Sequence, residues 1–177
     1  MRYVALLRGI GPSNPNMHGS KLKGFFESLG FKNVSPVISS GNVVFDSPSR
    51  NTRALEANIE KELPTRLGFK STTIIRSKAE LESIERKDPF KKVRANPHFY
   101  LFVTFLKEHH SSLRTFPRKG KGYAIAGATR RELFTYLHLK KGGHTPDYMR
   151  VLEKEFGKGI TSRTWLTIGR ILKKMRG

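Results

Sequence analysis

Three polar stretches of the chain hold the residue types that bind phosphate or carboxylate groups. Arg163 lies in the segment 161–164 (TSRT), and its planar guanidinium matches the oxygen atoms of such an anion. This segment is predicted to precede a helix, whose free N–H groups and positive dipole end also attract anions. Arg8 supplies a second guanidinium, and residues 39–42 (SSGN) supply neutral donors. The pattern indicates an anion pocket built from these three stretches.

The same residues also have an architectural interpretation. Thr161 or Thr164 would then cap the helix, Gly41 and Asn42 would form a tight turn, and Arg8 would pair with a nearby carboxylate. Ser, Thr, Asn and Gly are the usual residues at caps and turns. The sequence therefore favours the architectural interpretation and leaves the pocket as the alternative.

Two aromatic features could contribute to binding. Trp165, the single tryptophan, lies beside the predicted cap and could stack on a base or another ring, although an anchor in a core or between subdomains is the commoner role. Residues 99–105 (FYLFVTF) weakly resemble the aromatic strand of an RNA-recognition sheet but lack its basic, glycine-containing lead. We expect most of these aromatic side chains to lie in a core.

Motifs for other kinds of chemistry are missing from the sequence. The chain has no cysteine, which excludes disulfides, zinc ribbons and thiol nucleophiles. Its six histidines have no metal-binding spacing, and His109 and His110 are adjacent and point in different directions. No G-x-S-x-G, dinucleotide-binding or Walker motif occurs. We expect no metal and no cofactor, no catalytic residue can be named, and whether the protein is an enzyme is left open.

Net charge is the most unusual property of the composition. The formal charge is +20, and residues 86–177 carry 22 basic and 6 acidic side chains against 12 and 8 in residues 1–85. Such a field attracts polyanions with a strong dependence on salt. Nucleic acid or another polyanion is the predicted partner, and simple solubility is the alternative reading of the charge.

The first half is predicted to be strand, helix, strand, strand, helix, strand. Apolar, β-favouring runs predict strands, and apolar residues three and four positions apart predict helices at 19–30 and 51–68, the second bent or ended by Pro64. Pro36 places its strand at a sheet edge or at the strand's beginning. This is the order of the ferredoxin-like split βαβ fold, an antiparallel sheet with both helices on one face.

The second half is predicted to be an α/β subdomain of similar order. A capping box, Ser77 with Glu80, predicts a short helix to about Ile84, and the basic segment 86–97 reads as a linker. Strands are expected at 98–106, 123–127 and 132–139, a helix from Thr145-Pro146-Asp147 to Phe156, and a terminal helix over 161–175. We predict an α+β protein with two ferredoxin-like subdomains, 1–85 and 86–177, and an internal duplication.

The N-terminal apolar run, interrupted by Arg8, is far shorter than the roughly 20 residues that a membrane span needs. No secretory signal pattern follows it. We expect a soluble cytoplasmic protein with no membrane partner, and the oligomeric state is left open.

Three separated stretches resemble a bacterial family catalogued as domain of unknown function 1697. They are YVALLRGI followed by NPNM, LGFKNV followed by VISSGNVVF, and ITSRTWLTI. The motif positions that correspond to the family pattern are Arg8, Gly9, Ile10, Ser40, Gly41, Asn42, Thr161, Arg163, Trp165 and Thr167. The resemblance implies two fused ferredoxin-like subdomains and no established activity. Residues 11–14 (GPSN), Thr164 and Leu166 depart from it, and the last two replace asparagines.

These observations lead to two expectations for function. The first is a non-enzymatic binding protein whose basic C-terminal half contacts nucleic acid or another polyanion. The alternative is a protein or enzyme that binds a small phosphate or carboxylate compound in a pocket between the subdomains. The candidate ligand-binding residues are Arg8, Ser39, Ser40, Gly41, Asn42, Thr161, Arg163, Trp165 and Thr167.

Overall fold

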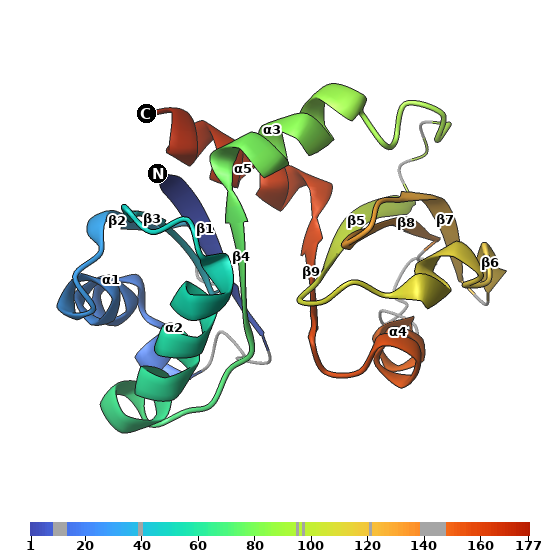
Figure 1. Ribbon diagram of the computed structural model, residues 1–177. Helices are drawn as coiled ribbons and strands as arrows, with labels where there is room; N and C mark the ends of the chain where they lie inside the picture. The colour runs from blue at the N-terminus through green and yellow to red at the C-terminus, as the bar shows by residue number, and fades with distance from the viewer. Residues whose placement is uncertain (9–13, 39–40, 95, 97, 121, 139–147) are drawn as a thin grey trace. The chain divides into compact units, whose positions relative to one another are not determined.

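The computed structural model describes residues 1–8, 14–38, 41–94, 96, 98–120, 122–138 and 148–177 (Figure 1). Its contacts divide the chain into two compact units, Met1–Ser83 with Gly169–Gly177, and Ile84–Ile168. The boundary thus falls inside two helices, and the last nine residues group with the first unit rather than with the C-terminal half. The domain boundary at residue 85 therefore stays a prediction.

The first unit contains a four-stranded antiparallel sheet with two helices on one face (Figure 1). Its elements are β1 (Arg2–Leu7), η1 (Pro15–Met17), α1 (Gly19–Ser28), β2 (Lys32–Pro36), β3 (Asn42–Asp46), α2 (Thr52–Leu67) and β4 (Thr73–Ser77). The strands are arranged in the order β2-β3-β1-β4, with every neighbouring pair antiparallel. This element order confirms the sequence prediction, and Pro36 does lie on an edge strand.

Alternation along β1 explains how the core of this unit is built. Tyr3, Ala5 and Leu7 point toward α1 and α2 and pack with their apolar side chains. Val4 and Leu6, on the other face of the same strand, are also fully buried. A strand that is buried on both faces reads as a continuous apolar run, as this one does.

Helix α2 continues past Pro64, which was predicted to bend or end it. The Asn51 side chain caps its start by accepting a hydrogen bond from Ala54 N at 3.0 Å. The helix ends at Leu67, and Gly68 follows in the left-handed conformation with φ 73°. The predicted range 51–68 is thus confirmed to within one residue at each end, and only the alternative that Pro64 ends the helix is wrong.

The second unit contains a five-stranded antiparallel sheet. Its elements are β5 (Phe99–Leu106), η2 (Ser111–Arg114), β6 (Lys119–Gly120), β7 (Tyr123–Ala128), β8 (Glu132–His138), α4 (Tyr148–Phe156) and β9 (Ile160–Thr164). The strands are arranged in the order β6-β7-β8-β5-β9. One face of this sheet packs with η2 and α4 through a cluster that includes Leu113, Leu133, Leu137 and Leu152. The chain is therefore α+β with two antiparallel sheets, as predicted.

Each sheet's last strand in sequence leads directly into a helix. Helix α3 (Lys78–Lys87) follows β4, and the predicted capping box is present: Ser77 N donates to Glu80 Oε2 at 2.7 Å and Glu80 N donates to Ser77 Oγ at 3.3 Å. Helix α3 runs three residues past the predicted end at Ile84. Helix α5 (Trp165–Arg176) follows β9.

Residues 160–164 correct the prediction of a terminal helix over 161–175. They form strand β9, which pairs with β5 from Phe102↔Thr164 to Leu106↔Ile160. Threonine and isoleucine favour strands, and open backbone positions beside β5 supply the hydrogen-bond partners. The helix starts only at Trp165. The predicted helix start at 145–147 lies outside the described residues.

Two further observations concern membrane-spanning helices and metal sites. In the part of the chain that the structure describes, no helix is long and apolar enough to cross a membrane. Within those same residues, no three His, Asp or Glu side chains gather in a group that could hold a metal ion.

Candidate functional site

Arg8, Gly41 and Asn42 lie at one end of the first sheet. Leu7 N donates to Gly41 O at 2.8 Å, so the residue before Arg8 is bonded directly to the segment. Asn42 is fully buried, and its Nδ2 donates to Val37 O at 3.2 Å. The Asn42 amide therefore holds the backbone at Val37, five residues earlier. Residues 39 and 40, the two predicted serine donors, lie outside the described residues.

A glycine is required at position 41 by both backbone conformation and space. Gly41 has φ +66°, in the region that disfavours residues with a Cβ. A Cβ there would lie 3.0 Å from Leu7 Cβ and 3.2 Å from Met17 Cε. Gly41 is thus packed against the end of β1, which fits the architectural interpretation of this segment.

Thr161 and Arg163 lie in strand β9 of the second unit. Arg163 Nη1 donates to Thr161 Oγ1 and to Ser162 O, both at 2.8 Å. Burial of the guanidinium lowers the pKa of Arg163 to about 10, so it stays positively charged at neutral pH. Its contacts with its own strand hold the side chain in place.

Thr164, Trp165 and Thr167 form the start of α5. Thr167 N donates to Thr164 Oγ1 at 3.2 Å, and the two hydroxyl oxygens lie 2.9 Å apart, so Thr164 is the N-cap. The Trp165 ring makes an edge contact with the Phe90 ring, with centroids 5.4 Å apart. Because Arg8, Gly41 and Asn42 belong to one unit and the 161–167 residues to the other, the joint anion pocket stays a prediction.

A second surface, which the sequence indicated only weakly, lies on the second sheet. Phe99 pairs with His138 and Leu101 pairs with Tyr136, so these four side chains share one face. This is the face opposite to the one that packs on α4. The rings of Phe99 and Tyr136 are 5.0 Å apart, and those of Phe99 and His138 are 5.6 Å apart. Phe99 and Tyr136 are half-buried, while His138 is exposed.

Basic residues lie next to this aromatic face because Phe90 anchors their segment. Phe90 is 5% exposed and contacts the rings of Phe134 and Trp165. Phe134 lies two positions before Tyr136 on the same strand and face. The predicted linker is therefore fixed to the sheet at Phe90, and its cations are held near Phe99 and Tyr136.

The cations and the aromatic pair line a common pocket of about 610 Å³. Its lining residues are Lys87, Asp88, Pro89, Lys91, Lys92, Val93, Arg94, Phe99, Ile125, Ala126 and Tyr136. A volume of this size accommodates a small molecule or one segment of a larger ligand. We call the group Lys87, Lys91, Lys92, Arg94, Phe99 and Tyr136 the basic aromatic surface.

A neighbouring pocket of about 480 Å³ shares Phe99 and Tyr136 with the first. It also includes Lys119 of β6 and His138 of β8. The aromatic pair therefore separates two hollows, each of which has positive or titratable side chains on its wall.

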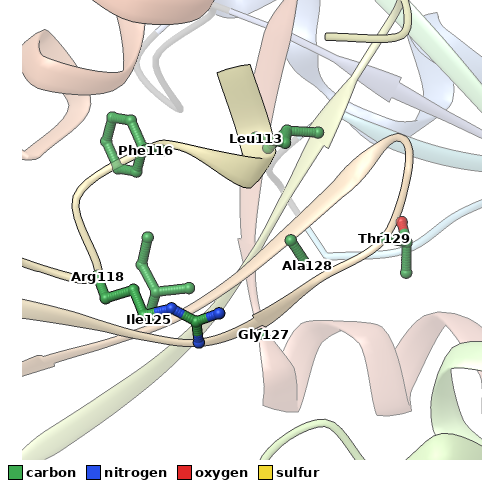
Figure 2. A pocket seen from close by; sticks show the side chains of 7 residues that line it. All are labelled: Leu113, Phe116, Arg118, Ile125, Gly127, Ala128 and Thr129. Carbon is green, nitrogen blue, oxygen red and sulfur yellow. The ribbon is translucent and has the colours of Figure 1, made fainter. Parts of the chain in front are cut away.

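A third pocket of about 390 Å³ lies between η2 and β7 (Figure 2). Leu113, Phe116 and Ile125 give it apolar walls, and Arg118 is the one charged side chain among the described lining residues. Figure 2 shows the Arg118 guanidinium beside Ile125 and Gly127. The pocket therefore combines apolar side chains with the Arg118 guanidinium.

A protein-family model described as "Protein of unknown function (DUF1697)" matches residues 1–134. The chain belongs to this family. The matched range contains the first two stretches that carried the resemblance, while the third, ITSRTWLTI, follows it. No curated protein matches the sequence of this DUF1697 chain.

A solved structure shares the fold of this DUF1697 protein. It is a conserved bacterial protein, SP0830 from Streptococcus pneumoniae, with a TM-score of 0.75 and 20% sequence identity. The similarity covers 98% of each chain. At this identity the likeness shows the fold alone.

Proposed function

We propose that this DUF1697 protein is a non-enzymatic binding protein that contacts nucleic acid through the basic aromatic surface of its second unit. The observation that carries the proposal is the pocket that Lys87, Lys91, Lys92 and Arg94 line together with Phe99 and Tyr136. Lysine and arginine neutralise phosphates, and aromatic rings stack on bases.

The charges of this surface are available to a ligand. None of the ion pairs formed among the described residues involves Lys87, Lys91, Lys92 or Arg94. All four side chains are exposed. The excess of positive charge in residues 86–177 adds a field that speeds the encounter with a polyanion.

Binding of a labelled oligonucleotide, followed by fluorescence anisotropy at low salt, tests the proposal. We expect the triple variant Lys91→Gln/Lys92→Gln/Arg94→Gln to lose at least tenfold in affinity. A matched control, Lys32→Gln/Lys61→Gln/Lys70→Gln, removes the same charge from exposed positions of the first unit and should change affinity by less than threefold. No measurable binding at low salt would end the proposal.

The third pocket supports a second candidate function, binding of a small carboxylate with an apolar body. Arg118 would hold the carboxylate, and Leu113 and Phe116 would contact the apolar part. A titration with 3-phenylpropionate, followed by amide chemical shifts, should perturb η2 and β7, and Arg118→Gln should weaken the response at least fivefold. Shifts scattered over other surfaces would contradict this candidate.

The predicted pocket between the subdomains remains a distinct form of this second candidate. It needs Arg8 and the 39–42 segment together with Thr161, Arg163, Trp165 and Thr167. A titration with inorganic phosphate, followed by amide chemical shifts, should perturb the residues around Arg8, and Arg8→Gln should weaken that response. Absence of any shift at Arg8 with phosphate present would count against it.

We also propose that both units are ferredoxin-like and related by duplication. The strand order β2-β3-β1-β4 of the first unit has the same connectivity as β7-β8-β5-β9 in the second. Val4 pairs with Arg76 in the first sheet, and Val103 pairs with Arg163 in the second. In both units the arginine is followed by a cap residue, Ser77 or Thr164, and then by a helix. The shared strand connectivity, the shared valine–arginine pairing and the shared order of arginine, cap residue and helix support the duplication.

A further inference from the structure

Phe99 and Tyr136 form an aromatic pair that is unusually open to solvent. The other face of their sheet packs in a well-filled apolar core. Both rings are only half-buried, although Phe134 and Val103 on the same face are fully covered. Burial therefore decreases along the face toward His138, which is exposed. Phe99 and Tyr136 therefore keep part of their ring surface open at this end.

The position of the pair between two hollows is the second observation. One hollow has Lys91, Lys92 and Arg94 on its wall, and the other has Lys119. A polymer that placed a flat ring on Phe99 and Tyr136 would therefore meet positive charge on both sides of that ring. This arrangement matches the chemistry of a nucleotide within a chain, with a base at the centre and a phosphate at each end.

We infer that this surface binds single-stranded nucleic acid, with a base stacked against Phe99 and Tyr136 and the flanking phosphates at the two basic walls. The inference rests on the proposed function and names its substrate class.

Duplexes are disfavoured because stacking on Phe99 and Tyr136 needs the open face of a base. Bases within a double helix are stacked on one another and cannot present a face to a side chain, whereas an unpaired strand can turn its bases outward. Phe99 and Tyr136 are half-buried and line both hollows, so a base must enter a hollow to stack on them. Polyanions without bases would use the lysines alone.

The test measures the binding of three probes to the 177-residue protein: a labelled twelve-nucleotide oligouridylate, a duplex of the same length, and polyphosphate. We expect the single strand to bind at least tenfold more tightly than the duplex. Phe99→Leu and Tyr136→Leu, which keep an apolar side chain at each site, should each lower affinity for the single strand about tenfold. Neither should change affinity for polyphosphate by more than twofold.

Tyr100→Leu is the matched control. Tyr100 is adjacent in sequence and 49% exposed, but it alternates to the opposite face and lines neither hollow. Its substitution should leave single-strand affinity unchanged. Circular dichroism and the thermal midpoint show whether each variant is folded, and a folded Tyr136→Leu that binds as well as the wild type contradicts the inference.

The outcomes separate this inference from the proposed function. If none of the three probes binds at low salt, both fail. If all three bind equally and the aromatic substitutions have no effect, the basic surface binds polyanions and only the single-strand inference fails. Stronger effects of Tyr100→Leu than of Phe99→Leu would place the contact on the opposite face and also overturn it.

Discussion

Arg76 and Arg163 donate the same hydrogen bond in the two units. Arg76 Nη1 donates to Ile75 O at 3.0 Å, and Arg163 Nη1 donates to Ser162 O at 2.8 Å. Each guanidinium thus folds back on the carbonyl of the preceding residue, just before the helix that follows its strand. Arg76 is fully buried, whereas Arg163 is partly exposed.

Replacement of Arg76 should therefore be more harmful than replacement of Arg163. Arg76→Ala removes a large, fully buried side chain and leaves its hydrogen-bond partners unsatisfied, so we expect a loss of about 3 kcal/mol in the free energy of unfolding. Arg163→Ala should cost roughly half as much. Urea unfolding of both variants measures the difference. Equal, small effects would show that the two side chains contribute little to stability.

The two helix caps that follow these arginines give a second prediction. Ser77→Ala removes the acceptor for Glu80 N, and Thr164→Ala removes the acceptor for Thr167 N. Each should lower the free energy of unfolding by about 1 kcal/mol. Ser77→Asp retains a cap oxygen and should lose less. If Thr164→Ala is neutral, that hydroxyl is not the working cap of α5.

A third prediction concerns Gly41, which lies in the segment first considered as a ligand site. Gly41→Ala should lower the free energy of unfolding by roughly 2 kcal/mol, because it adds left-handed strain and crowds Leu7. Gly24→Ala is the control: it lies within α1, meets nothing within 4 Å, and should stabilise the helix by up to about 1 kcal/mol. A neutral Gly41→Ala would contradict the architectural role.

Tyr148 gives a dependence of stability on pH. Burial raises its pKa to about 12, while its hydroxyl lies 2.6 Å from Thr135 Oγ1. The folded protein therefore holds this proton more tightly than the unfolded chain, whose tyrosine pKa is near 10. The stabilisation of the folded state by protonated Tyr148 is complete below pH 10 and is lost as the pH rises from 10 to 12.

Comparison with Tyr148→Phe isolates this effect from other groups. Between pH 9 and pH 12 the wild type should lose roughly 2 to 3 kcal/mol more than the variant in the free energy of unfolding. Arg163, whose pKa is lowered, contributes with the opposite sign in both proteins and cancels in the difference. Parallel pH profiles for the two proteins would contradict the assignment.

Much of the fold was predictable because local signals and packing agree. In α2, Leu55, Ile59 and Leu63 recur at helical spacing, and all three are buried. The capping box at Ser77 was predicted from its spacing and is present. The order of elements in the first half follows from such signals, since each strand and helix there has a clear beginning and end.

Strand β9 was missed because nothing separates it from the next helix. Thr164 is both the last residue of the strand and the cap of α5, so a cap pattern near Thr161 looked equally suitable. The β-branched residues Ile160, Thr161 and Thr164 were the available signal. Their partner strand, β5, lies more than fifty residues earlier, and that pairing is not visible in local sequence.

The basic aromatic surface could be predicted only in part. The charge excess and the aromatic run at 99–105 were both visible in the sequence. Which ring remains open depends on the register with β8, which puts Phe99 and Tyr136 together, and on Phe90, which holds the basic segment near them. Both are tertiary relationships between segments distant in the chain.

The salt dependence of oligonucleotide binding tests the central proposal most directly. A plot of log affinity against log salt concentration should be linear for the wild type, with affinity falling steeply as salt rises. For a single strand, loss of the three charges in Lys91→Gln/Lys92→Gln/Arg94→Gln should make the slope shallower by roughly two. An identical slope in wild type and triple variant would show that these cations do not contact the phosphates and would contradict the proposed binding surface.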